Sequence, residues 1–192
     1  MKFFAFLLLA AIAFQAVSAN NLCPKYAAQK NYTRQVDFMT DWVNKVYNKA
    51  VAPESYTVQF FDGTQNGTDV NYTTNITAAV ELITGWVEYF ASVQPFKCND
   101  GTVAAYTNNQ TIDEIHNNMP IDIYAVQEFN SDVNDVLTEF GFSKSDLSEV
   151  QDWLDSLFDD LCNTNCEVYN DAFSLNPAVI VCSISVVLAL FL

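Results

Sequence analysis

Three long stretches of the chain have an apolar side chain at every third or fourth position. Residues 36–50, 76–93 and 124–140 follow this spacing, which places the apolar side chains on one face of an α-helix. Gly141 follows the third stretch and is expected to end that helix as a left-handed cap. Residues 56–61 are too short to assign, and no other stretch alternates long enough to predict a strand.

Two more helices are predicted from their capping residues. Ser143 and Asp146, three residues apart, are expected to form the N-cap of a helix whose apolar positions continue to Leu161. Thr111 and Glu114 form a capping box for a short helix that must end before Pro120. The pattern therefore predicts one all-α domain.

The N-terminal end of the chain has the features of a secretory signal peptide. Residues 1–19 begin with Lys2, continue with an apolar run and finish with small residues up to Ala19. This order is typical of a segment that is removed after export. The remaining domain is therefore predicted over residues 20–170, in the secretory pathway.

The C-terminal end is apolar but short. Residues 178–192 carry no charge, and as a helix they would span roughly 22 Å, less than the roughly 30 Å hydrocarbon core of a bilayer. Small residues precede the run, starting at Asn170. We expect residues 171–192 to be a GPI-anchor signal, with Asn170 as the attachment site and Ser174 as an alternative. A tail anchor that stays in place is the competing interpretation.

Composition and charge fit a protein at the outer face of the plasma membrane. Of 192 residues, 51% are hydrophobic, and much of that fraction lies in the two ends. The 23 acidic residues outnumber the 8 basic ones, for a net charge of −15. This charge argues against a nucleic-acid partner, because phosphate binding needs clustered Lys and Arg, and it helps to keep a surface protein soluble.

Cysteines and sequons support the same compartment. Cys182 leaves with the C-terminal signal, so four cysteines remain and predict two disulfides, with three possible pairings. Cys162 and Cys166 lie one turn apart near a helix end, so we expect one of them to reach Cys23 and the other Cys98. Their C-x-x-x-C spacing does not favour a redox role.

Five N-x-T sequons predict exposed, glycosylated positions. Three of them fall within ten residues of one another, which predicts an exposed loop or a helix entry there. The sequon asparagines are Asn31, Asn66, Asn71, Asn75 and Asn109.

His116 limits the chemistry, because it is the only histidine in the chain. A zinc site of several histidines is excluded, and disulfide-bonded cysteines supply no thiolates. The sequence has no P-loop and no G-x-S-x-G turn. Haem is one cofactor that needs only a single neutral imidazole, in a slot lined by apolar and aromatic side chains.

The residues around His116 resemble a known family. The segment from 114 to Leu157 looks like the C-terminal half of a truncated haemoglobin of the first group. It consists of residues 114–121 and then of apolar helical positions, which are interrupted at Phe140-Gly141-Phe142. Upstream, residues 41–46 resemble that family's second helix. Residues 60–64 resemble its haem-packing Phe-Phe-x-Gly-Thr segment, and 86–90 its distal helix. The similarity covers residues 34–161.

The resemblance implies a globin-like helical sandwich that holds haem, and the two disulfides predicted from the cysteines would stabilise it. His116 would be the proximal iron ligand, and Phe61, with Phe60 beside it, would pack on the porphyrin. The resemblance also supplies the residues of the two walls. These would be Val43, Leu82 and Trp86 on the distal side, and Ile112, Met119, Ile121 and Phe129 on the proximal side.

The distal side departs from the family pattern. Val43 stands where the family commonly has Tyr, and Leu82 and Trp86 stand where a polar side chain would hold oxygen. This leaves no obvious proton donor and argues against a dioxygenase or a peroxidase. If the distal helices align with the family in another register, Tyr47 or Tyr89 would supply the missing hydroxyl.

Three hypotheses follow from these observations, and the third is an acidic helical enzyme with an unrecognised site. In the first, the protein is an extracellular haem-binding globin that binds or senses a small gas (oxygen, NO or CO) at the cell surface. In the second, it is a globin-shaped, haem-free glycosylated coat or adhesion protein. The first hypothesis expects His116 to face a flat slot walled by Phe61, and filling of that slot by Trp86 or Met119 favours the second.

Overall fold

The computed structural model describes residues 21–65, 69–108 and 110–166. Over these residues the chain is helical and has no strand, which confirms the all-α prediction. The predicted signal peptide, the sequons Asn66 and Asn109, and the predicted anchor site Asn170 with residues 171–192 lie outside the described residues. None of the described helices is long and apolar enough to cross a membrane.

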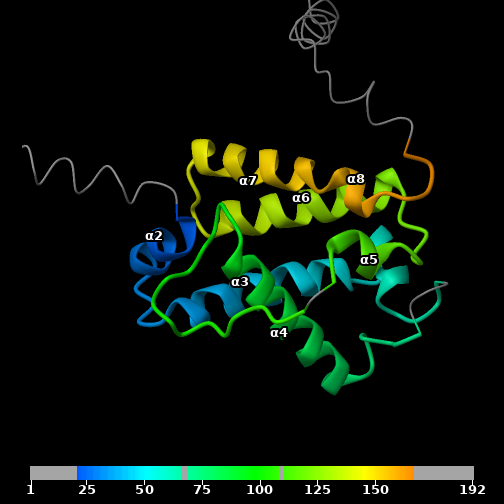
Figure 1. Ribbon diagram of the computed structural model, residues 1–192, viewed down its shortest axis with the longest axis horizontal. Helices are drawn as coiled ribbons and strands as arrows, with labels where there is room; N and C mark the ends of the chain where they lie inside the picture. Colours follow the sequence, from blue (N-terminus) through cyan, green and yellow to red (C-terminus); the bar gives the residue numbers. More distant parts are fainter. Residues whose placement is uncertain (1–20, 66–68, 109, 167–192) are drawn as a thin grey trace, which may run out of the picture.

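Eight helical segments follow one another in the described part of the chain (Figure 1). They are α2 (Leu22–Gln29), α3 (Gln35–Ala50), η1 (Tyr56–Phe60), α4 (Ile76–Ser92), α5 (Ile112–His116), α6 (Ile123–Glu139), α7 (Lys144–Ser156) and α8 (Phe158–Leu161).

The predicted caps form as expected. Ser143 accepts a hydrogen bond from the backbone N–H of Asp146 at the start of α7, and the Thr111–Glu114 capping box forms at the start of α5. Gly141 has a φ of 76°, so the chain turns between α6 and α7 in the left-handed conformation that glycine adopts without strain. The turn lays α7 beside α6 (Figure 1).

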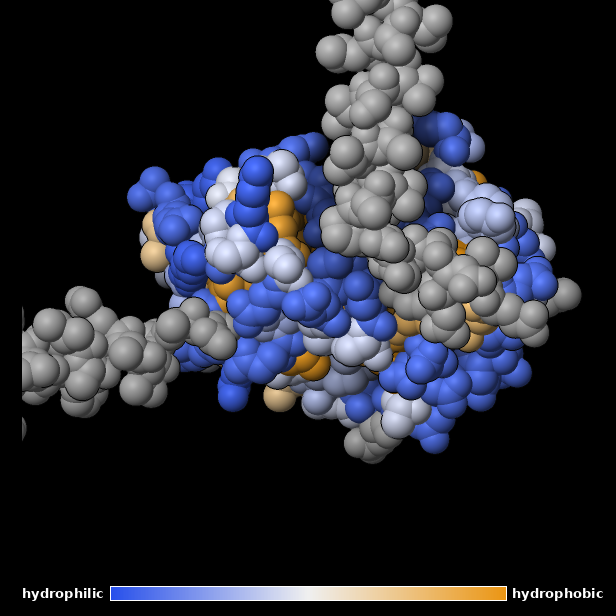
Figure 2. Space-filling model, turned by 90° about the horizontal axis from the view of Figure 1, so that it is seen from above, coloured by the Kyte–Doolittle hydropathy of each residue, from blue (hydrophilic) through white to orange (hydrophobic). Residues whose placement is uncertain are grey.

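Helix α3 is the centre of the packing, with contacts to α2, α4, α6 and η1. Its Trp42 is fully buried and stacks on Phe96, with ring centroids 5.0 Å apart, while Phe90 of α4 lies 5.2 Å away. Burying a large aromatic side chain contributes more to the free energy of folding than any single surface contact. The outer surface is mostly hydrophilic on the face shown in Figure 2.

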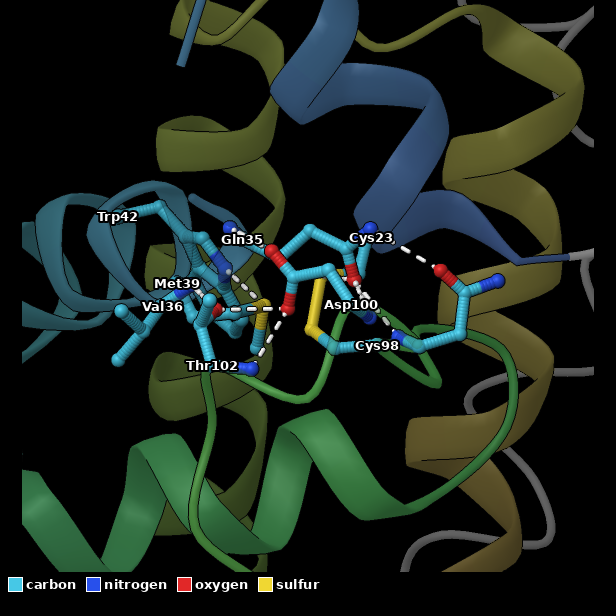
Figure 3. Close-up of a disulfide and its surroundings, with 9 residues drawn as sticks. Cys23, Gln35, Val36, Met39, Trp42, Cys98, Asp100 and Thr102 are labelled. Carbon is cyan, nitrogen blue, oxygen red and sulfur yellow. Dashed lines mark hydrogen bonds between the residues drawn. A yellow bond between two sulfur atoms is a disulfide. The ribbon is translucent and has the colours of Figure 1, made fainter. Parts of the chain in front are cut away.

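The start of α3 is capped by a distant loop. Its own N-cap residue, Arg34, makes no side-chain cap. Instead Asp100 Oδ2 accepts the N–H of Gln35 at 2.7 Å, and Thr102 Oγ1 accepts the N–H of Val36 at 3.1 Å (Figure 3). These acceptors satisfy backbone donors that the first turn of a helix leaves open.

The disulfide pairing differs from the prediction. Cys23 bonds Cys98, with Cα atoms 5.2 Å apart, and Cys162 bonds Cys166, with Cα atoms 5.9 Å apart. The prediction was wrong because it kept both C-terminal cysteines on one helix. Helix α8 ends at Leu161, Cys162 is extended, and Asn165 adopts a left-handed φ of 55° that turns the chain back.

The two disulfides are expected to stabilise the fold unequally. Replacing Cys23 and Cys98 by Ser removes a crosslink with a sequence separation of 75, and the matched pair Cys162→Ser and Cys166→Ser removes one with a separation of 4. Loop-closure entropy predicts losses of about 4 and about 2 kcal/mol in the free energy of unfolding. Urea denaturation of both double variants measures these losses, and equal or reversed losses would contradict this assignment.

Candidate functional site

His116 is the last residue of the single-turn helix α5. Its Nδ1 lies 2.8 Å from the carbonyl oxygen of Ile112. Because a carbonyl oxygen only accepts, Nδ1 must carry the proton and donate, which leaves the lone pair of the neutral ring on Nε2. Burial lowers the pKa of His116 below its ordinary value, although the hydrogen bond to Ile112 opposes this shift.

The C-terminal turn holds the segment around His116 in place. Asn163 donates its side-chain N–H to the His116 carbonyl oxygen at 3.0 Å, and the backbone N–H groups of Asn163 and Thr164 both donate to the carbonyl of Ile121. Ile121 packs against a small second core around Phe158 and Cys162. The Cys162–Cys166 disulfide therefore closes the turn that supports α5.

The predicted haem-packing residue Phe61 lies in an aromatic cluster that also contains residues of both predicted haem walls. We call Tyr47, Phe61, Tyr72, Trp86 and Phe129 the Trp86 cluster. Trp86 is at its centre, with ring centroids 5.9 Å from Phe61, 6.4 Å from Tyr47 and 5.6 Å from Phe129, each in an edge-to-face arrangement. Such arrangements are favourable contacts between rings.

The remaining predicted site residues are divided among different parts of the fold. Val43 is fully buried in the main core, and Phe60 is buried as well. Leu82, Ile112 and Met119 are half-buried. The structure thus brings Phe61, Trp86 and Phe129 together, whereas the hydrogen bonds of His116 join it to its own helix and to the C-terminal turn.

Tyr47 belongs to the Trp86 cluster, and its position in the sequence indicated where it lies. It lies four residues after Val43 and therefore on the same face of α3. Its hydroxyl donates to the carbonyl oxygen of Tyr72 at 2.8 Å, and burial raises its pKa. The Tyr47 hydroxyl, one of the two alternative donors named above, is thus already bonded to the backbone.

The described residues offer little support for a metal site of several ligands. They contain no group of three or more His, Cys, Asp or Glu side chains that could hold a metal ion. A hollow lined by Ala91, Ser92, Cys98 and neighbouring small residues has a volume of about 160 Å³ and no ionisable side chain.

No protein-family model matches the chain, and neither the curated proteins nor the solved structures yield a significant match.

The half-buried imidazole of His116 leads to a prediction about pH. The folded state keeps His116 neutral, with a pKa below the ordinary value of 6.5, so protons bind more readily to the unfolded chain. Its contribution to stability is therefore complete above pH 6.5 and is lost as the pH falls towards the folded pKa. We expect wild type to lose more unfolding free energy than His116→Gln between pH 7.5 and pH 5.5. Urea titrations at several pH values measure this difference, and parallel curves would contradict it.

Proposed function

We propose that the chain is a globin-shaped glycoprotein that works without haem, as a coat or adhesion module displayed at the outer face of the plasma membrane. The observation that carries this proposal is the direct contact between Trp86 and Phe129, whose ring centroids are 5.6 Å apart. By the resemblance to truncated haemoglobins, these two residues belong to opposite walls of the haem slot.

A porphyrin between these walls would need more room than the two rings leave. Atoms in contact with each face of the porphyrin stay about 3.5–4 Å from its plane, so side chains on opposite faces are separated by about 7 Å. Trp86 instead touches Phe129 and Phe61 at once. This packing, in which Trp86 takes up the space beside Phe61, is what the haem-free hypothesis expects.

The globin-like shape is supported by the order of the elements. Helix α3 corresponds to the segment that resembles the family's second helix, and α4 contains the residues that resemble its distal helix. His116 ends the short helix α5, and the two helices α6 and α7 follow it and are joined at Gly141. This is the order that the resemblance implies.

Display at the cell surface is supported by the sequons and the disulfides. Asn31 and Asn75 are exposed, and Asn71 is half-buried. Asn71 and Asn75 use their side-chain oxygens to cap backbone N–H groups at Thr74 and Ala78, so the nitrogen to which a sugar is joined is not used by the cap. Two disulfides suit an oxidising compartment.

The haem-binding globin is the second candidate, and the environment of His116 favours it. Histidines that bind metals usually donate their other ring N–H to a carboxylate or a backbone carbonyl, as His116 does to Ile112. Bound haem would supply an iron atom that holds oxygen, NO or CO. For this candidate Trp86 would have to leave Phe129, with His116 as the proximal ligand and Phe61 against the porphyrin.

One experiment decides between the two candidates. The full chain is produced in eukaryotic cells, released from the surface with phosphatidylinositol-specific phospholipase C, treated with an N-glycosidase and mixed with haem. We expect release by the lipase, a lower mass after the glycosidase, and identical visible spectra for wild type and His116→Ala.

Each arm has a result that would contradict the proposal. A Soret band that is present in wild type and absent in His116→Ala, with equal helicity by circular dichroism, would establish the haem-binding globin. Retention on the cells after lipase treatment would contradict the lipid anchor, whatever the spectrum shows.

A further inference from the structure

A hollow of about 600 Å³ lies where η1 meets helix α6. Tyr124, Glu128 and Asp132 of α6 follow one another at intervals of four residues and share one face of the helix. The hollow is lined by these three residues together with Tyr56, Gln127 and Ser131. It combines aromatic and acidic side chains and is separate from the residues of the Trp86 cluster.

Two tyrosine rings form a corner of this hollow. The rings of Tyr56 and Tyr124 have centroids 6.3 Å apart and planes at 70° to each other. Tyr56 is 43% exposed and Tyr124 63% exposed, which makes them two of the few large apolar side chains that the described surface leaves open. The faces of aromatic rings carry negative electrostatic potential and attract cations.

Tyr56 is held in position by hydrogen bonds. Its hydroxyl donates to Asp122 Oδ2 at 2.6 Å, and its backbone N–H donates to Glu128 Oε1 at 2.9 Å. The same Glu128 oxygen accepts the hydroxyl of Ser55 at 2.9 Å. One wall of the hollow is thus fixed in place before any ligand arrives, which lowers the entropic cost of binding.

One carboxylate oxygen of Asp132 has no hydrogen-bond donor. Its Oδ2 is enclosed and has no hydrogen-bond partner. Its Oδ1 lies 4.0 Å from Lys49 Nζ, which is closer, at 3.0 Å, to Asp135. Burial raises the pKa of Asp132 to about 6; Lys49 opposes this shift, and Glu128 and Asp135 add to it. A partly buried carboxylate whose only cation is 4.0 Å away gains from a second positive charge nearby.

We propose that this hollow binds a primary alkylammonium group, as presented by a lysine side chain of a partner protein. The aliphatic stem lies against the rings of Tyr56 and Tyr124, and the ammonium group donates to Asp132 and Glu128. The net charge of −15 draws cations toward the protein. The proposal does not depend on haem or on the lipid anchor, and it adds a partner chemistry to the role in display.

The lining favours a primary over a quaternary ammonium. Quaternary ammonium ions have no N–H groups and are recognised by cages of aromatic rings. Here two rings stand beside four side chains that accept hydrogen bonds, namely Gln127, Glu128, Ser131 and Asp132. A primary ammonium has three N–H donors that these acceptors satisfy.

The test is a nuclear magnetic resonance titration of the isotope-labelled full chain purified from cells. The ligand is Nα-acetyl-lysine methylamide, and the comparison compounds are its uncharged norleucine analogue and tetramethylammonium. We expect the amide signals of Tyr124, Glu128 and Asp132 to shift with a millimolar Kd for the lysine compound, and binding at least about fivefold weaker for the other two. Equal binding of either comparison compound would overturn the proposal.

Variants locate the effect in the hollow. Tyr124→Ala removes an exposed ring and should weaken binding about two- to fivefold, and Asp132→Asn should weaken it about fivefold. Asp152→Asn removes the same charge from an exposed position on α7 and should leave binding unchanged. If Asp152→Asn weakens binding as much as Asp132→Asn, net charge explains the result and the proposed site is wrong.

A second readout separates binding from a structural role of Asp132. A bound ammonium favours the charged carboxylate, so a saturating amount of the lysine compound should lower the pKa of Asp132 from about 6. The carboxyl carbon shift of Asp132 measures this change. An unchanged pKa at saturation would place the ligand elsewhere and overturn the proposal.

Discussion

The disulfide between Cys23 and Cys98 holds the loop that caps helix α3, and the rest of the fold depends on that helix. Asp100 and Thr102 supply the acceptors that the start of α3 lacks, across more than sixty residues of sequence. Because α3 contacts α2, α4, α6 and η1, the direction in which it begins sets the position of these elements. The crosslink removes loop-closure entropy from the unfolded chain, so the cap forms between segments that already lie close together.

The packing around α3 also determines what the candidate site can do. Tyr47 of α3 and Phe129 of α6 both touch Trp86 of α4, so three helices meet in one aromatic cluster. His116 carries its proton on Nδ1 and has a pKa below the ordinary value because of burial, but it is attached to the C-terminal turn. A ligand between Trp86 and Phe129 would break contacts between α4 and α6, and this cost favours a function that uses the surface of the domain.

Local signals in the sequence predicted α3, α4, α5, α6 and α7, whereas α2 was not predicted and η1 was left unassigned. Contacts between distant segments also escaped prediction. The apolar periodicity from 124 to 140 and the cap at Ser143 depend only on residues that are close in sequence. The predicted bounds of α6 and the predicted start of α7 both match the structure to within a residue. The pairing of Cys23 with Cys98 depends on where the chain passes after α4, which no local pattern records. The Cys162–Cys166 bond depends on a single left-handed residue, Asn165. The ring neighbours of Trp86 likewise come from α3, from α6 and from Phe61 after η1, and the resemblance that assigned Trp86 to a haem wall holds no record of these contacts.

The contact between Trp86 and Phe129 is the most direct test of the haem-free account. Nuclear Overhauser effects between the indole protons of Trp86 and the ring protons of Phe129 report this contact in solution. The account predicts that these cross-peaks are present in the purified protein and keep their intensity and chemical shifts when an equimolar amount of haem is added. Loss of the cross-peaks on addition of haem, with a simultaneous shift of the His116 ring protons, would contradict it.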